Sequence, residues 1–106
     1  MYITDALDLN VLPDYPPWML VDVRRMKVDE IREMIMSIIE RKKIHKIVAK
    51  SDEVIEILTK LIGIKFSPTI VGTNVKLKEK DSILVIQRKD DNKYELYFIK
   101  LIIYCP

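Results

Sequence analysis

Two stretches of this chain repeat apolar residues at the spacing of an α-helix, and a short β-branched run lies between them. From Val28 the apolar side chains recur at every third or fourth position with charged residues between them, which predicts a helix packed on one face. We expect this helix to end near Lys42. The second stripe comprises Val54, Ile57, Leu58, Leu61 and Ile62. Two such helices beside β-branched strands restrict the chain to an α/β fold.

The ends of the second helix have recognisable signals. Ser51 is an N-cap candidate, because its hydroxyl can accept a hydrogen bond from a free amide of the first turn. Asp52 and Glu53 follow where the helix dipole favours negative charge. Gly63 is the expected stop after the last turn.

The remaining apolar segments predict strands. Residues 13, 16 and 17 are prolines and exclude regular helix from 12 to 18. The last strand is apolar on both faces, so it is either central in its sheet or covered by another subunit. We expect a mixed α/β domain with one sheet of about five or six strands and two main helices, in an order that the sequence does not give. The predicted strands are 2–6, 19–23, 44–49, 71–77, 82–87 and 94–104, with a turn at 78–81 and a hairpin loop at 88–93.

Length and composition limit the classes of protein further. A chain of 106 residues supports one core, so we expect a single domain over residues 1–106. A net charge of +2 is too close to balance to indicate a protein that binds polyanions through overall charge. The single cysteine, Cys105, disfavours internal disulfides and cysteine-ligated metal. We find no signal peptide pattern and no membrane span, which predicts an intracellular protein.

The amino-acid usage resembles that reported for hyperthermophiles. The chain has 17 Ile and 13 Lys beside two Ala and one Gln. With two glycines in all, a Gly-rich phosphate loop has little to be built from, and no Walker or dinucleotide-binding motif is present. We expect no cofactor, and no cluster of His, Asp and Glu has metal-ligand spacing.

Several residues that could bind a ligand each have an ordinary structural explanation. Amides at the helix start after Ser51, with Lys46 and Lys50 nearby, could hold a phosphate, although capping alone accounts for the serine. His45 is the single histidine and is more often a packed or exposed imidazole than a catalyst. Arg88 lies in a polar loop, and the ordinary explanation for such a loop is a solvated hairpin tip.

The segment after the first strand is equally ambiguous. Asp5, Asp8 and Asn10 could coordinate Mg²⁺ or a sugar hydroxyl, and they are equally good turn residues. The basic run at 41–43 suits a helix end that is solvated and complements the dipole.

Three motifs resemble the viral ring nucleases, a family of small homodimeric anti-CRISPR proteins from crenarchaeal viruses. The opening stretch at 5–12 and the Tyr15-Pro16 pair are similar to the family's Asn-Ala opening and its aromatic-Pro pair. The family's second motif is a strand that ends in Gly-His, an amphipathic helix, and a glycine twelve residues after the His. This chain resembles it in having a strand, an amphipathic helix and Gly63. A third motif is matched by Gln87, Arg88 and Asp91 at the end of an apolar strand.

The resemblance implies a homodimer that binds cyclic tetra-adenylate between its subunits in the host cytoplasm. The family cleaves this messenger without metal, and its His is thought to protonate the leaving oxygen. Counting back twelve residues from Gly63 places Ser51 where that His is expected, and serine cannot act as an acid near pH 7. We therefore expect binding without cleavage and no catalytic residue. The ligand-binding candidates are Asn10, Lys50, Ser51, Gln87, Arg88 and Asp91.

Two departures from the family leave an alternative open. Asp5 and Asp8 stand where the family has neutral side chains, and carboxylates repel a polyanion. About six residues replace the longer segment that closes over the ligand in the family. Both favour a protein-interaction module with a host protein as partner and no nucleotide. Binding of duplex nucleic acid is disfavoured, since it requires the basic residues to gather on one face.

Overall fold

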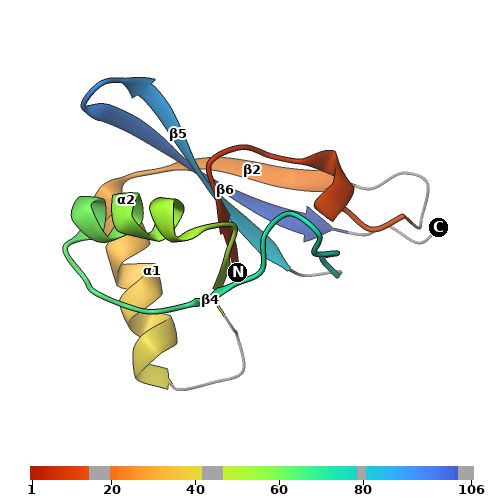
Figure 1. Ribbon diagram of the computed structural model, residues 1–106, viewed down its shortest axis with the longest axis horizontal. Coiled ribbons are helices and arrows are strands. Elements are labelled where there is room, and N and C mark those ends of the chain that lie inside the picture. Colours follow the sequence, from red (N-terminus) through yellow and green to blue (C-terminus); the bar gives the residue numbers. More distant parts are fainter. Residues whose placement is uncertain (15–19, 42–46, 79–80, 103–106) are drawn as a thin grey trace.

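The computed structural model describes residues 1–14, 20–41, 47–78 and 81–102. Six strands form one mixed sheet in the order β2-β6-β5-β1-β3-β4, and two α-helices accompany it (Figure 1). The predicted α/β fold class is therefore confirmed. The elements are β1 (Tyr2–Thr4), the 3₁₀-helix η1 (Leu9–Val11), β2 (Leu20–Met26), α1 (Val28–Arg41), β3 (Val48–Ala49), α2 (Asp52–Ile62), β4 (Thr69–Ile70), β5 (Ser82–Asp90) and β6 (Lys93–Ile102).

The central position of β6 explains its apolar residues on both faces. β6 pairs antiparallel with β2 on one side and with β5 on the other, so neither of its edges is free. Leu96 belongs to the core on one face, and Ile99 and Leu101 belong to the core on the opposite face. The first of the two explanations offered by the sequence, a central strand, is confirmed.

The two helices pack on one face of the sheet. Buried Ile31 and Ile35 of α1 and Leu58 of α2 share a core with Ile3 of β1 and Leu84 of β5. The predicted ends of α2 are also confirmed. The Ser51 hydroxyl accepts a hydrogen bond from the backbone N–H of Val54, and Gly63 ends the helix in the left-handed conformation at φ 71°.

The other face of the sheet, called the open face below, is partly covered by loops. Val11 of η1 and Leu77 are buried there against β1, β5 and β6. The strand predicted at 71–77 is wrong. A turn at Gly72, with φ 68°, ends β4, and the Leu77 N–H then bonds the carbonyl of Val11 outside the sheet. Alternating apolar residues in this segment reflect packing on the open face rather than strand pairing.

The hairpin predicted at 88–93 is confirmed, but the predicted length of its loop is wrong. β5 continues to Asp90 and β6 starts at Lys93, which leaves a two-residue turn of Asp91 and Asn92. Charged side chains can occupy both strands because the hairpin tip projects into solvent, and Asp and Asn suit tight turns. One register irregularity between Arg88 and Asp90 accommodates the turn.

Other strand bounds differ modestly from expectation. β1 ends at Thr4 rather than residue 6, and β2 extends to Met26, beyond residue 23. Of the strand predicted at 44–49, β3 covers Val48–Ala49, and His45 and Lys46 lie outside the described residues. Residues 15–19, most of the basic run at 41–43, and Cys105 also lie outside them.

Candidate functional site

A cleft of about 600 Å³ opens between α2 and the end of β5. It lies by the carboxyl ends of the parallel strands β1 and β5, which is where α/β sheets usually bind ligands. We call it the strand-end cleft. Its ionisable lining residues are Asp5, Glu53, Glu56, Lys60, Arg88 and Tyr94, and Gln87 also lines it.

Lys50 lies beside this cleft and is already paired. Its backbone N–H bonds the carbonyl of Ile3, which fixes it at the end of β3 next to β1. The Lys50 Nζ donates to Asp5 Oδ1 at 2.8 Å. That hydrogen bond raises the pKa of Lys50 above its ordinary value. The ammonium is therefore charged at neutral pH, and an acid that itself lines the cleft holds it.

Ser51 is accounted for by the cap. Its Oγ lies 3.4 Å from the Val54 backbone nitrogen, and this is the contact that the structure gives it. The hydroxyl therefore has one defined structural task, which supports the ordinary explanation given by the sequence. Its place at the start of α2 nevertheless puts the first-turn amides near Lys50 and Asp5.

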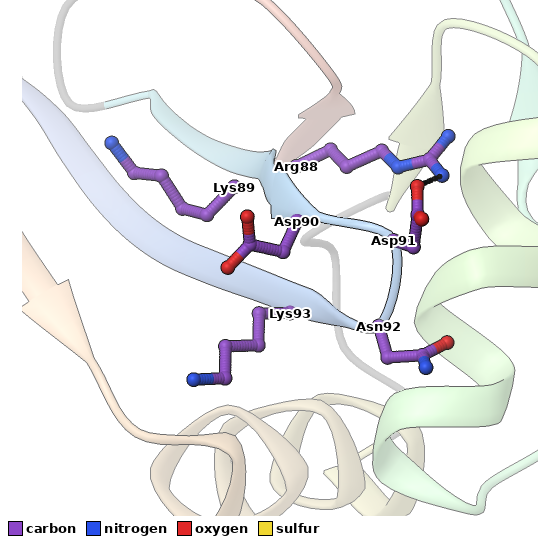
Figure 2. Close-up of a pocket in the computed structure, with 6 residues that line it drawn as sticks. All are labelled: Arg88, Lys89, Asp90, Asp91, Asn92 and Lys93. Carbon is purple, nitrogen blue, oxygen red and sulfur yellow. Dashed lines mark hydrogen bonds and ion pairs between the residues drawn. The ribbon is translucent and has the colours of Figure 1, made fainter.

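Arg88 and Asp91 lie together at the hairpin tip. The Arg88 Nη2 donates to Asp91 Oδ1 at 3.0 Å. Figure 2 shows these two side chains pointing toward each other on one side of the turn, and Lys89, Asp90 and Lys93 on the other. A wide hollow of about 630 Å³ surrounds this tip. Arg88 thus contributes to both the hairpin tip and the strand-end cleft.

Asn10 lies apart from the other candidates. It belongs to η1, where its N–H donates to Asp8 Oδ1 at 2.9 Å. It lines a separate hollow of about 330 Å³ together with Asp8 and Lys76. The described residues that line the strand-end cleft do not include Asn10.

Two acidic residues of the cleft, Glu53 and Glu56, were not predicted from the sequence to face a ligand. Glu53 and Glu56, with Lys60, recur at helical spacing on α2, opposite the buried Val54, Leu58 and Ile62. That polar stripe was available in the sequence as a signal. With Asp5, the cleft has three carboxylates against the two cations Lys60 and Arg88. Among the described residues no group of three or more His, Cys, Asp or Glu is arranged to hold a metal ion.

A second charged cluster lies on the open face, across β2, β5 and β6. The Tyr97 hydroxyl donates to Glu95, and the Arg25 guanidinium lies 5.6 Å from the centre of the Tyr97 ring. Arg25 and Lys89 form ion pairs with Glu95 at 3.9 and 3.5 Å. The Tyr97 hydrogen bond, assisted by these two cations, lowers the pKa of Glu95 below its ordinary value.

The open face also has a small apolar hollow of about 270 Å³. Leu7, Val23, Val85 and Ile99 line it, and Asp5 and Gln87 reach it from the strand-end cleft. Asp5 and Gln87 therefore border both this hollow and the strand-end cleft.

In the described part of the chain, no helix is long and apolar enough to cross a membrane.

Comparisons with known proteins bear on the fold. No family model and no curated protein matches this sequence. Among solved structures, the chain is similar to B116 of Sulfolobus turreted icosahedral virus, with a TM-score of 0.67 and 17% sequence identity. The match covers 92% of this chain and 96% of the viral one. At this identity the likeness establishes a shared fold, so the chain has the α/β architecture of a small archaeal virus protein.

Proposed function

We propose that this chain is a homodimeric viral protein that binds a cyclic oligoadenylate at the strand-end cleft and thereby counters type III CRISPR signalling without cleaving the messenger. The carrying observation is that Lys50, the capped start of α2, Gln87 and Arg88 gather at one end of the sheet. These groups supply two cations, an amide side chain and first-turn amides, a set suited to phosphates and nucleobases. The likeness to a viral protein of the same fold supports a viral origin.

The ion pairs at this cleft do not prevent phosphate binding. Lys50 and Asp5 are partly exposed, with side-chain exposures of 32% and 53%, and such surface pairs contribute about 0 to 1 kcal/mol. A phosphodiester of the ligand, which carries one negative charge, can therefore replace Asp5 as the partner of Lys50 at small cost. Cleavage is not expected, because Ser51 stands where the acid would be needed and already caps α2.

Titration calorimetry with cyclic tetra-adenylate tests this proposal, and a second, similar ion pair supplies the controls. Lys50 pairs with Asp5 at 2.8 Å beside the cleft, and Lys76 pairs with Asp14 at 3.0 Å elsewhere. Lys50→Ala should weaken binding about fivefold to tenfold, the effect of one charged contact of roughly 1 kcal/mol. Asp5→Asn should strengthen it, because it removes a carboxylate beside the phosphates.

The control variants and the product assay complete the test. Lys76→Ala and Asp14→Asn should leave the dissociation constant unchanged. No heat from the folded wild-type protein would refute the proposal. Weakening by Lys76→Ala but not by Lys50→Ala would place the ligand in the hollow of Asn10 and refute the strand-end assignment. Chromatography of the nucleotide after incubation should return it intact.

A protein-interaction module remains a second candidate, and the charge of the cleft favours it. Three carboxylates face two cations there, and both Lys50 and Arg88 already have acidic partners. A basic segment of a host protein would complement the three carboxylates of this surface. One stoichiometric partner captured from host lysate, released by Glu53→Lys and Glu56→Lys, together with a silent nucleotide titration, would decide for this candidate.

A further inference from the structure

The charged cluster on the open face converges on one acidic side chain. The Glu95 Oε2 accepts a hydrogen bond from the Tyr97 hydroxyl, and it lies 3.9 Å from the Arg25 Nη2 and 3.5 Å from the Lys89 Nζ. The Arg25 Nη2 also donates to the Tyr97 hydroxyl oxygen at 3.5 Å. The three donors come from the paired strands β2, β5 and β6, so the sheet itself sets their positions. We call these four residues the Glu95 cluster.

The small apolar hollow of the open face adjoins this cluster, and Tyr97 belongs to both. Val85 and Ile99, 8% and 5% exposed, form the floor of the hollow, and Leu7 and Val23, 41% and 53% exposed, form its walls. Exposed apolar surface beside polar groups marks sites that bind other molecules. At about 270 Å³ the hollow is smaller than most cofactor pockets and suits one apolar side chain.

The distance between the hollow and the cluster matches the repeat of an extended peptide. Glu95, Tyr97 and Ile99 alternate along β6 on the open face. At roughly 3.3 Å per residue, Tyr97 and Ile99 lie about 7 and 13 Å from Glu95 along the strand. Side chains two or four residues apart in an extended segment span the same distances. One such segment can therefore place an apolar side chain in the hollow and another side chain at the cluster.

The charges at the cluster indicate the sign of that second side chain. Figure 2 shows Lys89, Asp90 and Lys93 on the same side of the hairpin. Together with Arg25 and Glu95 they give this side three cations against two carboxylates. The surplus of one positive charge complements a single acidic side chain. A polyanion would bring successive charges against Asp90 and Glu95 as well.

We propose that the open face binds an extended acidic segment of a partner protein. An apolar side chain of the segment enters the hollow, and an acidic side chain two or four residues away replaces Glu95 between Arg25 and Lys89. The exchange preserves the ion pairs and the Tyr97 hydrogen bond. The side chains of Arg25, Lys89 and Glu95 are 71%, 45% and 31% exposed, and ion pairs at such exposure are weak enough to exchange. This surface is distinct from the strand-end cleft and needs no nucleotide.

Selection from a displayed library of random heptapeptides tests the chemistry of the occupant. The immobilised wild-type protein should enrich sequences in which Asp or Glu lies two or four residues from Leu, Ile, Phe or Met. No enrichment, or enriched sequences without an acidic residue, would overturn the proposal.

Fluorescence polarisation with the most enriched peptide, labelled with fluorescein, locates the surface. Arg25→Glu and Val23→Asp should each weaken binding at least about tenfold. Their matched controls are neighbours on β2. Arg24→Glu on the opposite face, and Val21→Asp on the same face but outside the lining of the hollow, should change the dissociation constant by less than about twofold. Circular dichroism checks that each variant is folded, and equal losses in a variant and its control would refute the assignment.

Two further variants give readouts that a merely structural role would not move. Glu95→Gln should strengthen peptide binding about threefold or more, because a neutral amide no longer competes for the cations. Weaker binding by this variant contradicts the exchange. Lys50→Ala should leave the peptide affinity unchanged while it weakens the nucleotide, so the two proposals fail separately. Loss of the peptide in Lys50→Ala would place it in the strand-end cleft instead.

A single-stranded oligothymidylate tests the other class of occupant. It should bind more weakly than the selected peptide, because its phosphates meet the carboxylates of the open face. Tighter binding that is lost in Arg25→Glu would make the occupant a nucleic acid and overturn the proposal.

Discussion

Replacing Ser51 by alanine removes the N-cap of α2 with little other change. The Oγ accepts one hydrogen bond, from Val54, at the long distance of 3.4 Å. Loss of a serine cap costs about 0.5 to 2 kcal/mol, and the long bond places this helix in the lower half of that range. We therefore expect a loss of about 0.5 to 1 kcal/mol. For a domain of this size that corresponds to a fall of roughly 2 to 6 °C in the melting temperature.

Thermal unfolding followed by circular dichroism at neutral pH measures this effect, and two further variants show its cause. Ser51→Asp keeps an acceptor at the cap and should melt near the wild-type temperature. Ser37→Ala makes the same chemical change in the middle of α1, where alanine is the better helix former, and should melt slightly higher. A Ser51→Ala protein as stable as wild type, or a Ser51→Asp protein as unstable as Ser51→Ala, would refute the capping argument.

Four other substitutions test the fold and its electrostatics. Leu58→Ala, at a position with no exposed surface, should lower the unfolding free energy by about 2 to 5 kcal/mol in urea titrations, whereas Leu9→Ala, at 72% exposure, should cost under about 0.5 kcal/mol. Gly63→Ala should lower the unfolding free energy by roughly 1 kcal/mol, because alanine is strained in the left-handed backbone conformation. A Cβ at this position meets no atom within 4 Å, so no steric clash adds to the strain. An unchanged midpoint of the urea titration would contradict this. The pKa of Glu95 is lowered in the folded protein, so its stabilising effect is present above the ordinary value of 4.5 and is lost as pH falls through the folded value. The difference in stability between wild type and Glu95→Gln should accordingly shrink from pH 6 to pH 3, and a constant difference would contradict the shift.

Local signals in the sequence were sufficient for the helices and for much of the sheet. The spacing of Ile31 and Ile35 defined the buried face of α1, and Ser51 and Gly63 bounded α2. These signals depend on contacts between residues that are close in the sequence, so they can be recognised without the tertiary structure. The apolar residues on both faces of the last strand left two explanations, a central strand or a strand covered by another subunit, and the strand order shows the first.

The errors came from segments in which the same pattern has two explanations. Val71, Val75 and Leu77 alternate like a strand, but they pack on the open face without pairing in the sheet. The charged residues from Arg88 to Asp90 read as a loop, although cross-strand bonding to β6 keeps them extended. In both cases a partner far away in the sequence decided the outcome.

The candidate site shows the same division. The sequence by itself determined which residue types lie near the strand ends and the helix start, because Lys50 and Ser51 follow one strand and Gln87 and Arg88 lie late in another. Tertiary structure decided which of them meet. Asp5 forms an ion pair with Lys50, and Glu53 and Glu56 line the cleft. Asn10 lines another hollow. The order of strands sets these distances, and that order depends on long-range pairing that short-range patterns do not encode.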